Sequence, residues 1–225
     1  MSQGPQYNKN RSYSQNNPSQ QQNNRPVDTN RQDSGSLADK QRKYEEYAWT
    51  LAYLSEGSPT DPNPFSQREP VIQAVGEIWF TLLELTPRRG VDVKPIMRIG
   101  IGKDNRAVIT RIKRRIGFED LSPTSELVLE DCIAEIVNNQ EFRFVNWFNK
   151  ASLVTSRMHA FKLLPGIGTT HLDNLLFERN RVNFTSFEDI SKRTKVSDPK
   201  KLIVARIIKE LTITDEKYRL FTRKP

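Results

Sequence analysis

One stretch decides how the C-terminal half of this chain folds: Phe161-Lys-Leu-Leu-Pro-Gly-Ile-Gly-Thr-Thr-His-Leu-Asp-Asn-Leu-Leu-Phe-Glu-Arg179. Its apolar spacing predicts a helix that ends at residues 163–164, a tight turn at residues 165–168, and a second helix with Leu172, Leu175 and Leu176 facing inward. Glycine has no Cβ, so Gly166 and Gly168 let the backbone take a positive φ and approach another molecule closely. The stretch therefore predicts a helical hairpin with an accessible turn.

This pattern resembles a helix-hairpin-helix module over about residues 153–180. In such a module the free N–H groups at the start of the second helix point at a phosphate, with the positive end of the helix dipole behind them. Ile167 is expected to plug the space between the helices, while the hydroxyls of Thr169 and Thr170 donate further hydrogen bonds and Lys162 adds charge. The alternative is an ordinary helical hairpin. Such modules often carry Lys or Arg after the second glycine, where this chain has Thr169-Thr170-His171.

A degenerate second hairpin follows over about residues 185–212. Thr185-Ser186-Phe187-Glu188 matches a capping box, and Asp198-Pro199 starts a last helix after a connector without glycine. This hairpin is expected to support the first one and to add basic surface; for each cation a merely solvated position is the alternative. The cations are Lys192, Arg193, Lys195, Lys200 and Lys201.

The helical pattern begins soon after Phe118. Ser122-Pro123 predicts a helix start whose apolar stripe includes Cys132, so that cysteine is expected to be a core residue. Further helices are expected around residues 142–148 and 153–163. Residues 118–225 are therefore predicted to form an all-helical domain.

Strand patterns occupy the region before it, after a short charged helix that is expected to end near Glu46. The five predicted strands are residues 47–54, 71–75, 78–85, 96–101 and 107–112. They favour a small OB-like barrel over residues 41–117, with an open five-stranded sheet as the alternative. The predicted fold class is α+β, with the barrel followed by the helical domain.

Charge is segregated where these two parts meet. Residues 103–115 carry a net charge of +5, and residues 116–142 carry seven acidic residues with no basic one. The basic cluster is expected to bind phosphate, unless the two blocks pair across the junction. The candidate phosphate contacts in it are Arg111, Lys113, Arg114 and Arg115. Phe65, Trp79 and Phe80 can stack bases on a barrel surface, although such aromatic residues usually fill the core.

The first 40 residues hold seven Gln and seven Asn, a composition that predicts a disordered tail. The tail carries +2 of the net +8, so it is either a solvated leader or a weakly basic arm for nucleic acid. One cysteine and two histidines exclude an intrachain disulfide and a thiolate zinc site, and no metal or cofactor is predicted. No apolar run approaches the roughly 18 residues of a membrane span, and a cytoplasmic monomer is expected.

Enzyme signatures do not match. Gly100-Ile-Gly-Lys103 resembles a phosphate loop, but Met97 stands where the earlier glycine is needed. The strongest enzymatic rival is a DNA glycosylase, which uses a similar hairpin followed by an aspartate, here Asp189. Strands lie upstream where such an enzyme needs helices, so no enzymatic activity is predicted.

Six motifs, in this order, resemble an archaeal family, the domain of unknown function 655, over about residues 44–223. They are Gln67-Arg-Glu-Pro-Val71, Phe80-Thr-Leu-Leu-Glu-Leu-Thr-Pro-Arg-Arg-Gly90, Lys113-Arg-Arg-Ile116, Phe118-Glu-Asp-Leu121, Leu163-Leu-Pro-Gly-Ile-Gly168 and Phe187-Glu-Asp-Ile190. The resemblance implies nucleotide or nucleic-acid binding by an OB-like barrel joined to a helix-hairpin-helix domain. It also implies an archaeal cytoplasmic protein near the transcription or translation machinery, and it alone favours RNA slightly over DNA.

The sequence thus predicts a non-enzymatic protein that grips an RNA or DNA backbone through Gly166–Thr170 and the basic cluster. The alternative is a scaffold that docks a ribosomal or RNA polymerase subunit.

Overall fold

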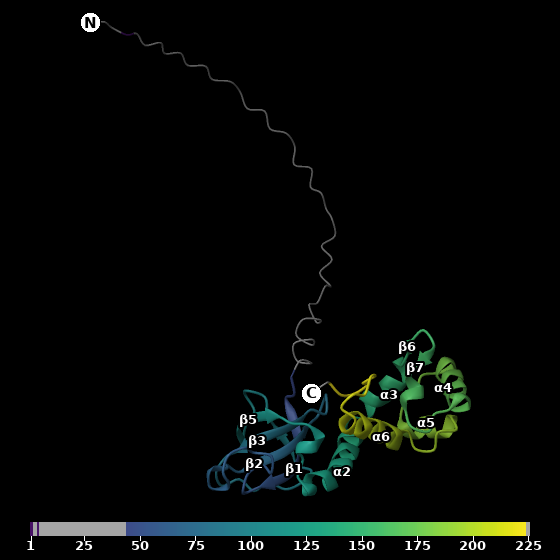
Figure 1. The fold of residues 1–225 in the computed structure, drawn as a ribbon. Helices are drawn as coiled ribbons and strands as arrows, with labels where there is room; N and C mark the ends of the chain where they lie inside the picture. The colour runs from purple at the N-terminus through teal and green to yellow at the C-terminus, as the bar shows by residue number, and fades with distance from the viewer. Residues whose placement is uncertain (2–3, 5–43, 224–225) are drawn as a thin grey trace.

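The computed structural model describes Met1, Gly4 and residues 44–223 (Figure 1). Apart from Met1 and Gly4, the tail predicted over residues 1–40 lies outside the described residues. The described chain is α+β, with a five-stranded sheet followed by five α-helices and a small two-stranded sheet.

The five strands form one antiparallel sheet in the order β4-β1-β2-β3-β5. They are β1 (Tyr47–Leu54), β2 (Val71–Gly76), β3 (Leu82–Pro87), β4 (Arg98–Gly100) and β5 (Ile109–Arg115). β4 and β5 are the two edges, and within residues 44–223 they do not pair with each other. The sheet is therefore a curled half-barrel that is open on one side, a barrel-like form that lies between the predicted small barrel and the open sheet given as its alternative.

The turn between β2 and β3 is longer than predicted, because β3 begins at Leu82 rather than at residue 78. The carboxylate of Glu45 accepts hydrogen bonds from the backbone N–H groups of Ile78 (2.9 Å) and Trp79 (2.8 Å). Phe80, fully buried, has a φ of 52°, a left-handed conformation that a strand cannot contain. Residues 44–46 are not helical, so the predicted charged helix does not extend to Glu46.

The five α-helices are α2 (Pro123–Asn139), α3 (Glu141–Lys150), α4 (Thr169–Arg181), α5 (Phe187–Arg193) and α6 (Pro199–Thr212). Three begin where the sequence predicts, because Ser122, Ser186 and Asp198 each accept a backbone N–H from three residues later. The acidic partner of the α5 cap differs from the predicted Glu188. Asp189 accepts the N–H of Thr185 instead.

The expected helix over residues 153–163 is wrong. This segment contains β6 (Leu153–Thr155), β7 (Met158–His159) and the 3-10 helix η3 (Ala160–Leu163), and β6 pairs with β7. Val154 and Thr155 are β-branched and suit a strand, and the His159 side chain accepts the N–H of Phe161 to start η3. The C-terminal half is therefore not all-helical. Further 3-10 turns are η1 (Phe65–Gln67) and η2 (Phe118–Asp120).

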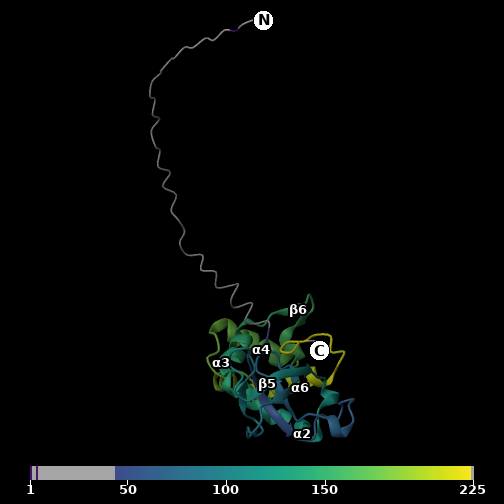
Figure 2. The same cartoon turned by 90° about the vertical axis from the view of Figure 1, so that its left-hand side faces the viewer.

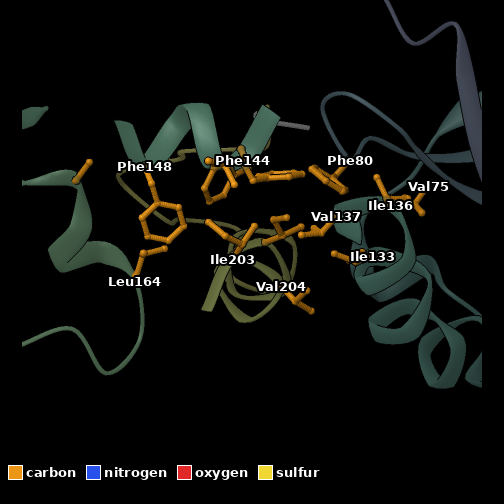
Figure 3. Packing of buried hydrophobic residues seen from close by; sticks show 14 of the residues in the cluster. Val75, Phe80, Ile133, Ile136, Val137, Phe144, Phe148, Leu164, Ile203 and Val204 are labelled. Atoms are coloured by element: carbon orange, nitrogen blue, oxygen red, sulfur yellow. The ribbon is translucent and has the colours of Figure 1, made fainter. Parts of the chain in front are cut away.

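One buried apolar cluster runs from the sheet into the helices (Figure 3). It includes Val75 and Phe80 near the sheet, Ile133, Ile136 and Val137 of α2, Phe144 and Phe148 of α3, Leu164, and Ile203 and Val204 of α6. α2 packs against both β1 and α6. The core is thus continuous across residue 117, where the sequence suggests a domain boundary. A second, smaller cluster fills the half-barrel around Ile72, Leu85 and Ile109.

Arg143 of α3 fastens the β2–β3 turn to the helices. Its guanidinium donates to the carbonyl oxygens of Glu77 and Ile78 and to the Gln140 side chain. It also lies 5.0 Å from the ring centre of Phe144 and 5.8 Å from that of Phe80. Burial lowers the pKa of Arg143 from its usual value.

The C-terminal segment (residues 214–223) is held against α6 by a buried carboxylate. Glu210 accepts hydrogen bonds from the N–H groups of Leu220, Phe221 and Thr222, from the Thr222 hydroxyl and from Arg206. Arg206 and Glu210 are both fully buried. The segment is therefore anchored by a charged group inside the protein.

Three other arginines cover helix C-termini. Arg179 donates to the carbonyls of residues 148 and 151 at the end of α3, and Arg193 to those of residues 178 and 182 at the end of α4. Arg219 donates to the carbonyls of residues 210, 213 and 214 at the end of α6. Each of them donates to carbonyl groups at or just beyond a helix C-terminus, where the intrahelical hydrogen bonds end.

The half-barrel occupies one end of the molecule, and α4 and α5 lie at the other (Figure 1). Figure 2 is turned so that the sheet end faces the viewer, with the helices behind it.

Candidate functional site

The turn before α4 is exposed, while its centre is anchored. Ile167 is 8% exposed and belongs to the main core cluster, as predicted for a plug. Gly166 has a φ of +77°, so a side chain there would strain the backbone. A Cβ added at Gly168 would meet no heavy atom within 4 Å, so the space outside this position is open. The structure contains the turn and the second helix of the predicted module, but η3 stands in place of the first helix.

A cavity of about 180 Å³ lies beside this turn. One wall consists of Pro165, Gly166, Ile167 and His171. The other wall comes from the connector before α6 and its first turn, and includes Lys195, Asp198 and Lys201. We call this cavity the hairpin groove.

Lys195 and Lys201 supply the positive charge that is missing after Gly168. Both are exposed, and neither side chain forms an ion pair among residues 44–223. The sequence identifies them as basic surface but does not place them at the glycine turn. One signal in the sequence could have placed them there. If the second hairpin packs against the first, the connector that contains Lys195 must lie next to the glycine turn.

The start of α4 is available for hydrogen bonding. Gly168 is its N-cap and has no side chain to accept the N–H groups of the first turn, where Thr169 and Thr170 are exposed. Asp198, the acidic residue of the groove, accepts the N–H of Lys201 at 2.9 Å and caps α6. Lys162, next to the turn, is exposed. Residues 150–201 contain ten basic and five acidic residues, so the electrostatic potential around this segment favours anions.

The predicted basic cluster lies on β5, and most of it is paired. Its side chains contact acidic residues mostly from other parts of the sheet end, and to a smaller extent from the acidic block at residues 116–142. Lys113 binds Asp61 at 2.6 Å, Arg114 binds Glu84 at 2.8 Å and Arg111 binds Glu69 at 3.2 Å. The described contact with the acidic block is Arg114 to Asp120 at 3.9 Å. Arg115 is exposed and forms no ion pair within residues 44–223.

The structure does not bring β5 and the hairpin groove together, since β5 and α4 lie at opposite ends of the molecule (Figure 1). The three aromatic candidates also separate. Phe80 is fully buried, Phe65 is 63% exposed near Arg68, and Trp79 is partly exposed with Arg223 over its ring.

We expect the Asp61–Lys113 pair to make the free energy of unfolding fall as the pH becomes acidic. The hydrogen bond from Lys113 lowers the pKa of Asp61 below its usual 3.8. A lowered folded-state pKa means that the pair stabilises the fold above the unfolded-state pKa and loses this effect as the pH falls through the folded-state pKa. Urea unfolding at pH 7 and pH 2.5 should show a smaller pH difference for Asp61→Asn than for the wild type. Asp92→Asn, at a highly exposed acid, should leave the difference unchanged; equal pH differences in all three proteins would contradict the prediction.

The residues weighed for catalysis have structural contacts. Cys132 is fully buried on α2, as predicted, and burial raises the pKa of its thiol to about 12. Asp189 accepts hydrogen bonds from Thr185 and pairs with Arg193 at 3.0 Å. Across residues 44–223, no three His, Cys, Asp or Glu side chains are grouped so that they could hold a metal ion. None of the helices in that range is long and apolar enough to span a membrane.

Comparison with known proteins gives a consistent result. A profile of the family described as protein of unknown function (DUF655) matches residues 44–223. The uncharacterized protein MJ0038 of Methanocaldococcus jannaschii is 38% identical over 185 residues, which cover 82% of each chain. The crystal structure of Af1531 from Archaeoglobus fulgidus, assigned to DUF655, superposes with a TM-score of 0.73 at 42% identity. It covers 80% of this chain and 100% of that one.

Proposed function

This chain belongs to the DUF655 family, and from its own surface we propose that it is a non-enzymatic nucleic-acid-binding protein that holds a sugar-phosphate backbone in the hairpin groove. One observation carries the proposal: the open glycine turn faces Lys195 and Lys201 across a cavity. In this proposal the turn and α4 act as the second half of a helix-hairpin-helix module, with η3 taking the place of the first helix.

The chemistry of the groove suits a phosphate. The first-turn N–H groups of α4 and the hydroxyls of Thr169 and Thr170 supply directed donors, and the two lysines supply charge. Because Gly168 has open space outside it, a polymer backbone can approach the main chain closely. Lysine side chains are flexible, so they can follow successive phosphates without fixing a base sequence.

Backbone contacts carry no base identity, so the groove accepts RNA and DNA, with RNA as our preferred ligand. We place the protein in the archaeal cytoplasm, near the ribosome or RNA polymerase. Arg115 on β5 remains part of the proposed binding surface, whereas Arg111, Lys113 and Arg114 contribute less because acidic neighbours already neutralise them.

The salt dependence of binding tests the groove. Combining Lys195→Gln with Lys201→Gln removes two phosphate-neutralising charges, so the slope of log K against log salt should become shallower. The expected change is about 1.4 on single strands and about 1.8 on duplex DNA. Fluorescence anisotropy with labelled RNA and DNA at several salt concentrations measures it.

A matched control uses two exposed cations at the sheet end outside the basic cluster, Arg89→Gln with Lys94→Gln, which should keep the wild-type slope. Gly168→Val provides an independent variant, since the structure has room for its Cβ and the fold should persist while the polymer is pushed away. Wild-type binding by both the double lysine variant and Gly168→Val would show that the hairpin groove is not the contact.

A protein-docking scaffold is the second candidate function. It is favoured by Leu127, which is 82% exposed on α2 among the acidic residues Glu126, Glu130 and Asp131. An acidic helix face with an exposed leucine suits a basic protein and repels nucleic acid. Failure of the wild-type protein to bind either RNA or DNA at low salt would favour this candidate.

A further inference from the structure

We propose that the open side of the half-barrel binds one unstacked base of a single-stranded nucleic acid, with Trp79 beside the base and Arg115 and Arg223 beside the adjoining phosphate. This inference rests on the proposed function, because the ligand is the same polymer, but it assigns a second contact at the opposite end of the molecule from the hairpin groove.

The contact lies where a closed barrel would join its edges. Within residues 44–223 β4 and β5 do not pair, and a cavity of about 90 Å³ lies on this open side of the sheet. Ile101, which follows β4, and Ile112 of β5 line its two sides, together with Leu83 and Trp79. Ile101 and Leu83 are buried and Ile112 is 36% exposed, so the cavity is a shallow apolar depression at the rim of the filled half-barrel.

The C-terminal segment forms the other border of the cavity. It leaves α6 and returns toward the sheet (Figure 1), so that Arg223 lines the same cavity as Arg115. A second depression of about 40 Å³ shares Thr81, Arg115 and Arg223 with the first. We call the two depressions together the seam groove.

The seam groove combines a flat aromatic surface with positive charge. The guanidinium carbon of Arg223 lies 4.0 Å from the centre of a Trp79 ring, a cation–π contact against which a base can pack. Arg115 is exposed at the rim. Glu45 is the acidic residue among those lining the groove, and its carboxylate is occupied by the N–H groups of Ile78 and Trp79.

Size and accessibility select the ligand. The two depressions are far smaller than the roughly 300–1,000 Å³ of a site that encloses a whole small molecule, but they can take the edge of one ring. In a duplex the faces of each base are covered by its neighbours, so only a single strand can offer a base to Trp79. The positive charges of Arg115 and Arg223 then favour a polyanion over a neutral aromatic ligand.

The test uses the full chain with a fluorescein-labelled 20-nucleotide single-stranded RNA and with a 20-base-pair duplex, followed by anisotropy. Trp79→Ala should weaken binding of the single strand by about tenfold, as expected for loss of one stacked base, and change duplex binding less than twofold. Arg115→Gln should weaken single-strand binding and lower its salt slope by about 0.7. Phe142→Ala and Arg89→Gln are matched controls, since both replace exposed residues outside the groove.

The outcomes separate the two proposals. Equal single-strand binding by wild type, Trp79→Ala and Arg115→Gln would overturn the seam groove and leave the hairpin groove standing. An equal loss on single strand and duplex would also overturn it, because a stacking site must prefer the single strand. Binding of neither polymer by the wild type would overturn both proposals.

A second variant keeps the test informative if the Trp79→Ala protein is unfolded. If thermal melting shows that Trp79→Ala does not fold, Trp79→Leu, which keeps an apolar side chain but has no ring to stack, decides the question with the same two ligands. A selective loss of single-strand binding supports the seam groove, and unchanged binding rejects it.

Discussion

Replacing Glu210 by alanine is expected to lower the free energy of unfolding by about 3–5 kcal/mol, the usual effect of breaking a buried ion pair by removing one partner. The carboxylate accepts three backbone N–H groups at 2.7–3.1 Å, and it balances the charge of fully buried Arg206. Its removal leaves these donors without an acceptor inside the protein.

Urea unfolding followed by circular dichroism measures the change, and hydrogen exchange locates it. The amides of Leu220, Phe221 and Thr222 should lose protection first. Asp215→Ala, at an exposed acid close by in sequence, should be near neutral. Similar stabilities for the Glu210 and Asp215 variants would show that the buried carboxylate does not anchor the C-terminal segment.

Arg143→Ala should have the next largest effect, a loss of about 2–4 kcal/mol. The side chain satisfies the carbonyls of Glu77 and Ile78 and fills space beside Phe80 and Phe144. Without it the Ile78 carbonyl loses its described donor, the Glu77 carbonyl keeps only the one from Gln140, and a cavity remains between the turn and α3.

Chemical denaturation of Arg143→Ala, Arg143→Met and Lys150→Ala separates these causes. Methionine restores apolar volume but no donors, so it should recover only part of the loss. Lys150 is exposed on the same helix and should be close to neutral. If Arg143→Met is as stable as the wild type, hydrogen bonding to the turn does not contribute.

Local signals predicted most of the secondary structure. β1 and the starts of α2 and α6 follow from an apolar run and from cap residues that act within three positions. The start of β3 was missed because Glu45, more than 30 residues away, organises the turn before it. The structure of residues 153–163 was not predicted, because their apolar spacing suits a helix. In the structure the β-branched pair lies in β6 and the His159 side chain starts η3.

The candidate site was predicted only in part, for the same reason. The glycine turn and the buried Ile167 are features of adjacent residues, so the sequence shows them directly. The approach of Lys195 and Lys201 depends on how the connector folds back. The neutralisation of β5 depends on Asp61 and Glu84, which the sheet brings to it from 30 to 52 positions away. Whether the sheet closes into a barrel likewise depends on whether its two edge strands pair with each other. No local sequence pattern specifies that pairing.

The arginines at the helix C-termini show that arginine and lysine have different structural roles in this chain. At positions 179, 193 and 219 one planar guanidinium reaches two or more carbonyl oxygens at once, and an ammonium group in its place has no fork with which to do so. In the phosphate site that we propose, positions 195 and 201 require only a mobile positive charge, so either cation serves there. Arginine and lysine are therefore interchangeable in the hairpin groove but not at the helix ends, and the net charge of +8 counts both kinds alike.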